Sequence, residues 1–162
     1  MSRELGGSRP KVGVMIGTGE VGAHDGGGAV GSGSGPMPLG RRVVWSRRIY
    51  LALALGFAAC VAVQVFFAGM GVFVDAARWS WHSSFIHVFE FLPLLMLPLA
   101  FSARLSAAVR WLTALLLALI ALQYITANMG TPLAALHPVN GMLIFWVATI
   151  IAGRAWRATV AR

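Results

Sequence analysis

Residues 49–73 read IYLALALGFAACVAVQVFFAGMGVF, an apolar run that contains one strongly polar residue, Gln64. A helix of this length crosses the hydrocarbon core of a bilayer. Three further apolar runs follow, at residues 82–101, 111–127 and 137–153. The connections between the runs are short, which favours antiparallel neighbours. The sequence therefore predicts an all-α fold, a four-helix transmembrane bundle with up-down-up-down topology over residues 41–157.

The composition excludes a soluble protein. The 162 residues are 58% hydrophobic and 11% charged, too few charges for a soluble domain of this size to cover its apolar surface. The net charge of +8 does not indicate nucleic acid, because most arginines stand at the ends of apolar runs. The expected partner is the lipid bilayer, with other membrane proteins or a second copy of the chain as further candidates. Cys60 is the only cysteine, so no disulfide can form within the chain.

Residues 1–40 hold most of the chain's 19 glycines and are predicted to be a disordered tail. The segment Gly17-Thr18-Gly19-Glu20-Val21-Gly22 has the spacing of a dinucleotide-binding turn. Such a turn must open a helix, and the glycine-rich sequence that follows cannot form one. The chain from Met37 onward reads as a short basic lead-in to a membrane helix, so translation is expected to start at Met37.

Arginine placement predicts the topology. One side of the bundle would hold nine arginines and the other only Arg78; the nine are Arg41, Arg42, Arg47, Arg48, Arg104, Arg110, Arg154, Arg157 and Arg162. Because basic residues stay on the cytoplasmic side, both termini are expected in the cytoplasm. The expected location is the plasma (inner) membrane of a bacterium.

Polar residues collect toward the predicted outer face: Gln64, His87, Glu90, Gln123, His137 and Asn140, with His82 at the edge. Ionisable groups inside a membrane mark functional sites, because leaving them in lipid is costly. Histidines on two helices at similar depth indicate axial ligation of a haem b. The candidate iron ligands are His137 on the last helix and either His87 or His82 on the second.

His82 and His87 are five residues apart and point roughly 140° away from each other on an ideal helix, so only one can face the bundle axis. His87 matches the depth of His137, and Glu90 shares its side, which favours His87. Gly141 would let a flat macrocycle approach the backbone, and Arg78 would pair with its propionates.

Simpler interpretations remain beside the haem hypothesis. His137 before Pro138 is also a common helix start. The amides of Gln64, Gln123 and Asn140 are also suited to hydrogen bonds that join neighbouring helices. If that is their role, the chain would be a cofactor-free structural or accessory membrane subunit. His87 and Glu90 would then be a structural pair or part of a proton path. No catalytic constellation is recognised, so an enzyme is not the favoured interpretation.

Several motifs together resemble one family: Arg47-Arg48-Ile49-Tyr50-Leu51, residues 63–73, Trp81-His82, Gln123-Tyr124 and Leu136-His137-Pro138-Val139-Asn140-Gly141. From Arg41 to about Arg157 the chain resembles the domain-of-unknown-function family 6220, small four-helix bacterial membrane proteins. The resemblance implies the fold and the membrane location, and no established activity. It also implies that His82 is the histidine of the second helix, although Ile86 stands where the family often has glycine.

Overall fold

The computed structural model describes residue 13 and residues 39–130 and 132–161. The prediction of a disordered tail with a start at Met37 falls almost entirely outside these residues. The elements are α1 (Arg41–Phe73), η1 (Ala76–Arg78), α2 (Trp79–Phe89), α3 (Leu92–Ser102), α4 (Ala107–Ala127), η2 (Pro132–Ala135) and α5 (Leu136–Val160). The described segments contain helices, turns and loops but no strand.

Four helical segments are long and apolar enough to cross a membrane: Arg41–Phe73, Ala76–Ser102, Ala107–Ala127 and Pro132–Val160. The second of them consists of η1, α2 and α3. Large apolar side chains cover the outside of the bundle; Phe73 is 87% exposed and Trp111 76% exposed. Such a surface needs lipid around it. The predicted four-helix transmembrane bundle is confirmed, and the chain is a multi-pass membrane protein.

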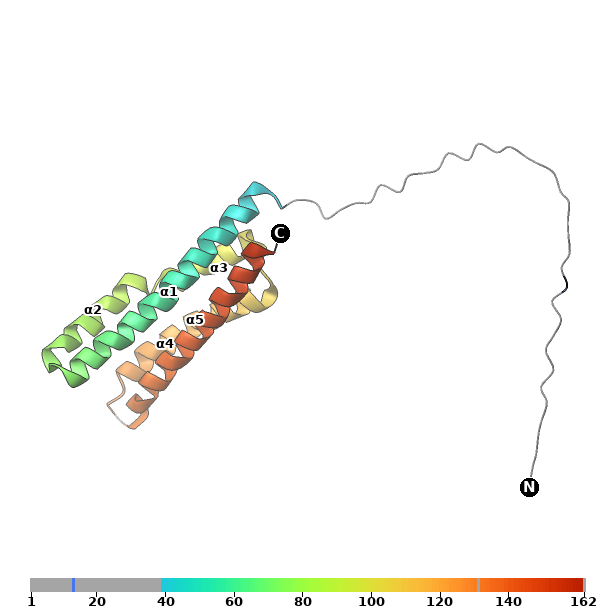
Figure 1. Cartoon of the computed structure of the whole chain (residues 1–162). Helices are drawn as coiled ribbons and strands as arrows, with labels where there is room; N and C mark the ends of the chain where they lie inside the picture. The colour runs from blue at the N-terminus through green and yellow to red at the C-terminus, as the bar shows by residue number, and fades with distance from the viewer. Residues whose placement is uncertain (1–12, 14–38, 131, 162) are drawn as a thin grey trace, which may run out of the picture. The chain divides into compact units, whose positions relative to one another are not determined.

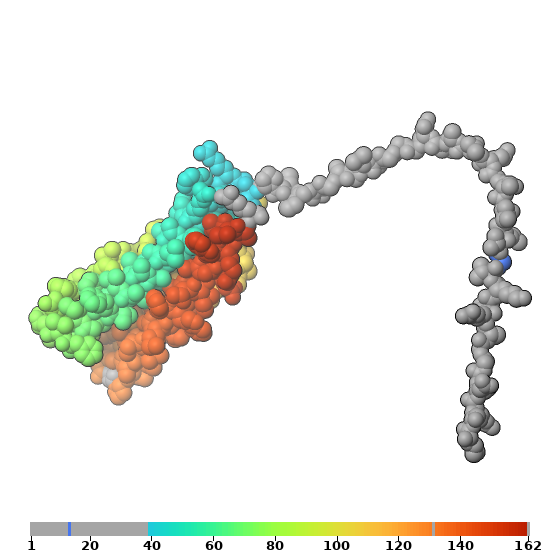
Figure 2. Space-filling model, in the orientation of Figure 1, coloured from blue at the N-terminus to red at the C-terminus, as the bar shows by residue number. Residues whose placement is uncertain are grey.

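The helices form a closed ring of neighbours. Helix α1 packs against α5 on one side and against α2 and α3 on the other, and α4 packs against α3 and α5. Figure 1 shows α2 running beside α1 at one end of the bundle, while α4 and α5 run beside each other. Figure 2 shows α1 and α5 side by side along one face, in green-cyan and orange-red. The bundle therefore has two antiparallel hairpins, α1–α2 and α4–α5.

Buried side chains on α3 and α5 recur every three or four residues, as one helix face requires. On α5 they include Ala148, Ala152 and Ala155, small residues that let two membrane helices approach closely. Several of the largest buried side chains lie in the half of the bundle nearer to Arg41 and Val160, with Tyr50, Met96, Leu116 and Ile151 among them. The hydroxyls of Tyr50 and Thr113 hydrogen-bond there at 2.5 Å, which joins α1 to α4.

Three helices are longer than their apolar runs predict. Helix α1 begins at Arg41 instead of 49, α4 begins at Ala107 instead of 111, and α5 continues to Val160 instead of 153. The prediction treated the arginines as flanks. Arginine is a good helix former, and its long side chain carries the charge away from the apolar part, so the helices continue through these residues.

The second apolar run is broken. It was expected to be one kinked helix, and it is two helices separated by Glu90 and Phe91. Pro93 stands at the start of α3 and has no N–H to donate to the carbonyl of Phe89. In a continuous helix its ring would also collide with that carbonyl, so the helix breaks before it. Pro98 lies inside α3, which continues past it to Ser102. Of the two prolines, only Pro93 coincides with a break.

Candidate functional site

A reciprocal pair of hydrogen bonds joins Gln64 of α1 to His82 of α2. The His82 Nδ1 lies 3.0 Å from the Gln64 carbonyl oxygen. In return, the Gln64 side-chain Nε2 donates to the His82 carbonyl at 2.8 Å. Because a carbonyl oxygen only accepts, Nδ1 is assigned the proton. The His82 ring is thereby fixed in orientation and tautomer, with Nε2 as its lone-pair nitrogen.

The same pairing recurs in the other hairpin. The His137 Nδ1 lies 3.2 Å from the Gln123 carbonyl oxygen, and the Gln123 Nε2 donates to the His137 carbonyl at 3.1 Å. This joins α4 to the start of α5 as the first pair joins α1 to α2. The two hairpins therefore each present one imidazole held by a glutamine of the partner helix.

The imidazole rings of the two hairpins are neighbours. The ring centroids of His82 and His137 are 6.3 Å apart, and their planes are inclined by 62°. The His137 Nε2 lies 3.0 Å from the Gln123 Nε2, and the described part of the chain gives the His82 Nε2 no hydrogen bond. Metal-bound histidines commonly have this arrangement, with Nδ1–H on a backbone carbonyl and Nε2 directed at the metal.

Asn140 is a buried residue of α5 that hydrogen-bonds to the glutamine of the second pair. Its side chain is 3% exposed, and its Nδ2 donates to the Leu119 carbonyl at 2.8 Å and to the Gln123 Oε1 at 2.6 Å. The bond to Gln123 orients the amide that contacts His137. The Asn140 Oδ1 and the Gln64 Oε1 are buried, and neither has a hydrogen-bond partner among the described residues. Buried acceptors of this kind are normally satisfied by water or a ligand.

His87 lies elsewhere. Its side chain is 64% exposed, and its Nδ1 is 2.9 Å from the Glu90 Oε1. Glu90 also accepts a hydrogen bond from the Tyr124 hydroxyl, which joins the α2–α3 break to α4. The expectation that His87 faces the bundle axis with Glu90 is therefore not met. The Glu90 side chain is 14% exposed, and its two partners, His87 and Tyr124, satisfy it without bringing the His87 ring into the bundle.

The remaining candidates lie close in the chain to His82 and His137. Trp79 packs edge-on against the His82 ring, with centroids 5.4 Å apart. The Arg78 guanidinium lies 4.8 Å from the Trp81 ring centroid, and its Nε is buried without a partner in the described chain. A Cβ on Gly141 would lie 3.5 Å from the Gln123 Nε2, an ordinary contact. Gly141 thus borders the glutamine.

The donor set limits which metal groups fit. No group of three or more His, Cys, Asp or Glu side chains gathers anywhere within residues 39–130 or 132–161. Protein sites for bare zinc need three or four such ligands. Two imidazoles instead fit a metal whose remaining ligands come from a macrocycle, as in haem.

Sequence reasoning missed three contributors: Trp79, Tyr124 and Gly71. A Cβ on Gly71 would lie 2.8 Å from the Trp79 ring, so only glycine lets the tryptophan lie where it contacts His82. The sequence signal for this contact was the pair of glycines at 69 and 71, which come shortly before the two tryptophans of the loop, Trp79 and Trp81.

Comparison with known proteins finds one matching family model. Residues 64–131 match the model of a family described as "Family of unknown function (DUF6220)". This is the family whose resemblance the sequence motifs predicted. The matched segment includes Gln64, His82 and Gln123 and ends before His137, so it is shorter than the expected span of residues 41–157. No curated protein and no solved structure matches the chain. The description of this family supplies no activity.

Proposed function

We propose that this membrane protein binds haem b between His82 and His137, for electron transfer or haem handling. The observation that carries the proposal is the pair of neighbouring imidazoles, each with Nδ1 on a backbone carbonyl of the adjacent helix. This hydrogen bond leaves Nε2 as the nitrogen that can hold iron. His87 is not part of this proposal, because its ring is exposed and bonded to Glu90.

The separation of the rings agrees with two imidazoles that would hold the same metal ion. Imidazole nitrogens bind metals at roughly 2 Å, and the ring centroid lies about 1 Å further out, so two imidazoles that shared one metal ion would have centroids at most about 6 Å apart. The centroids of His82 and His137 are 6.3 Å apart. Rings in edge-to-face contact have centroids about 4.5–7 Å apart, so the spacing fits such packing as well, and the hydrogen bonds at Nδ1 are what favour ligation.

Polar groups near the histidines also suit a haem. The buried, unpartnered Nε of Arg78 is a donor for a propionate, and Trp79 covers one side of His82. Ligation at His137 would replace the contact between its Nε2 and the Gln123 amide, which keeps its bonds to Asn140 and to the His137 carbonyl. A bound haem b would supply reversible one-electron chemistry at this end of the bundle.

The proposed orientation puts both termini in the cytoplasm. In the described chain, eight arginines lie near the end of the bundle that contains Arg41 and Val160, and Arg78 alone lies near the other. By the positive-inside rule, the histidine pair then lies near the outer face of the plasma membrane of a bacterium. An electron partner would approach from that face or from within the bilayer.

The test is the absorption spectrum of the protein and three alanine variants, purified in detergent from haem-supplied cells. His82→Ala and His137→Ala should each lose the spectrum of bis-histidine haem, because no other histidine reaches either position. His87→Ala is the matched control and should keep the wild-type spectrum. Loss of the spectrum in His87→Ala with retention in His82→Ala would contradict this assignment.

A second candidate is a cofactor-free membrane subunit whose polar residues hold helices together. The reciprocal Gln64–His82 and Gln123–His137 bonds favour it, since each already joins two helices without any cofactor. On this account His82→Ala and His137→Ala would cost at most about 1–2 kcal/mol of stability each. A wild-type protein that takes up no haem, together with such modest losses, would select this candidate.

A further inference from the structure

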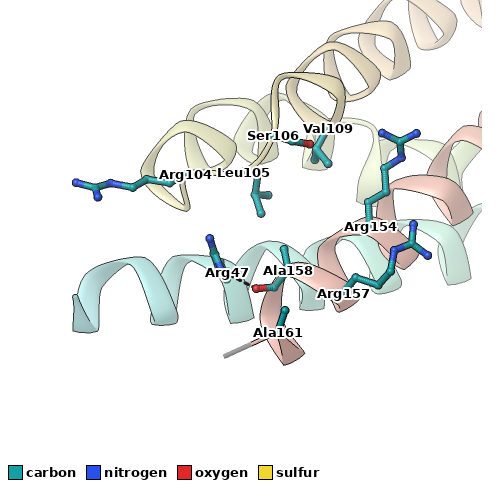
Figure 3. Close-up of a pocket in the computed structure, with 9 residues that line it drawn as sticks. All are labelled: Arg47, Arg104, Leu105, Ser106, Val109, Arg154, Arg157, Ala158 and Ala161. Carbon is teal, nitrogen blue, oxygen red and sulfur yellow. Dashed lines mark hydrogen bonds between the residues drawn. The ribbon is translucent and has the colours of Figure 1, made fainter. Parts of the chain in front are cut away.

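A pocket lined by arginines lies at the end of the bundle opposite to the histidine pair. Its volume is about 340 Å³, and its lining includes Arg47 of α1, Arg104 and Ser106 of the α3–α4 loop, and Arg154 and Arg157 of α5. Figure 3 shows Arg154 and Arg157 extending on the same side of the pocket, while the Arg104 side chain points away. The pocket therefore combines cationic side chains of the first and last membrane-crossing segments with the α3–α4 loop.

These cations have no counter-charge in the described chain. The carboxylates of residues 39–130 and 132–161 are those of Asp75 and Glu90. Asp75 accepts a hydrogen bond from the Ala77 N–H at the start of η1, and Glu90 is bonded to His87 and Tyr124. Arg154 and Arg157 are three residues apart on one helix, a spacing at which like charges repel.

Arg47 makes this end of the bundle rigid. Its Nε donates to the Ala103 carbonyl at 3.1 Å and its Nη1 to the Ala158 carbonyl at 2.6 Å (Figure 3 draws the second bond). These two bonds hold the last turn of α5 and the end of α3 against α1. The backbone around the pocket is thus fixed before any ligand arrives, which lowers the entropic cost of binding.

The start of α4 adds donors. Ser106 is the residue that precedes α4, its side chain makes no capping hydrogen bond, and the first turn contains no acidic residue. The first N–H groups of a helix need acceptors from outside it, and an anion supplies them well. Guanidinium groups and helix amides are the two donor types that bind phosphate oxygens in proteins.

We propose that this pocket binds the phosphate group of an anionic phospholipid. The occupant is a lipid because the pocket lies where arginines flank membrane-crossing helices, at the depth of headgroups, and basic pockets between such helices bind anionic headgroups. Arg154 and Arg157 would provide most of the positive charge, and Arg47 would keep α1, α3 and α5 together around the pocket through its two backbone hydrogen bonds. The site is independent of the haem proposal.

The experiment is lipid binding to the full-length protein in neutral detergent, measured by native mass spectrometry with phosphatidylglycerol, phosphatidylcholine and inorganic phosphate as probes. The wild type should prefer phosphatidylglycerol to phosphatidylcholine. The double variant Arg154→Gln/Arg157→Gln should bind phosphatidylglycerol roughly tenfold to thirtyfold more weakly, as expected for the loss of two headgroup arginines. Arg41→Gln/Arg42→Gln removes the same charge outside the pocket and should leave the preference intact.

Three results would overturn the proposal. Equal binding of the two lipids by the wild type would remove the headgroup preference. An equal loss in the Arg41→Gln/Arg42→Gln control would show a general charge effect without a site. Inorganic phosphate that binds the lipid-free protein as tightly as phosphatidylglycerol would assign the pocket to a soluble phosphate compound. Melting curves of both double variants, recorded in parallel, separate weak binding from loss of the fold.

Discussion

Trp79 connects the end of α1 to the ring of His82, and Gly71 makes this contact possible. A Cβ at residue 71 would lie 2.8 Å from the Trp79 ring, whereas a Cβ at residue 69 would meet nothing within 4 Å. Gly71→Ala should therefore destabilise the protein by about 1–3 kcal/mol, the usual cost of overpacking. Gly69→Ala is the matched control and should leave stability unchanged or slightly higher. Denaturant unfolding in detergent measures both; equal behaviour of the two variants would contradict the packing described.

The histidine pair shows how far a sequence can predict a site. The five-residue spacing correctly implies that only one of His82 and His87 faces inward. Depth counting then favoured His87, because it treated residues 82–101 as one helix and assumed that Glu90 must face the core. The break at Glu90–Phe91 invalidates the count, and Tyr124 and His87 satisfy Glu90 at the side of the bundle. Tertiary partners of this kind cannot be read from spacing.

At the scale of elements, the end of α3 combines a regular capping motif with an unusual residue. The Leu105 N–H donates to the Ala100 carbonyl and the Arg104 N–H to the Phe101 carbonyl, each at 3.0 Å. These bonds form a Schellman motif, in which the residue after the cap is left-handed and is usually glycine. Arg104 has that role here, with φ of 49°.

Arg104→Gly should accordingly stabilise the protein. A non-glycine residue in the left-handed region costs about 1 kcal/mol or more, and glycine removes that cost. The melting temperature of the variant in detergent should rise. Arg104→Ala removes the same charge but keeps a Cβ at the strained position, so it should show no such rise. A lower melting temperature for Arg104→Gly than for Arg104→Ala would contradict this account of the loop.

Helix ends and the helix break mark the limit of prediction from hydropathy. Apolar runs identified all four membrane-crossing segments, because length and composition are properties of each segment alone. They placed the ends of α1, α4 and α5 too close to the apolar part, since hydropathy does not register arginines that continue a helix. Pro93 and Pro98 look alike in the sequence, and only the packing around them distinguishes a break from a continuous helix.

At the scale of the whole molecule, arginine asymmetry predicts the orientation. In a variant without Cys60, a single cysteine at Ala76 should react with a membrane-impermeant reagent added outside intact cells, because η1 lies at the end with few arginines. A cysteine at Ser106, in the α3–α4 loop, should react only after the cells are opened. Both positions are exposed. Reaction of the Ser106 position in intact cells would reverse the orientation and move the histidine pair to the cytoplasmic side.

The proposed haem b would be held by the neighbouring imidazoles of His82 and His137. The most direct measurement is the haem content of the wild-type protein, purified in detergent from cells supplied with haem and then titrated with further haem. The account predicts about one haem per chain and the sharp visible band of reduced bis-histidine haem. A folded protein that stays colourless after expression with haem, and also after titration, would contradict it.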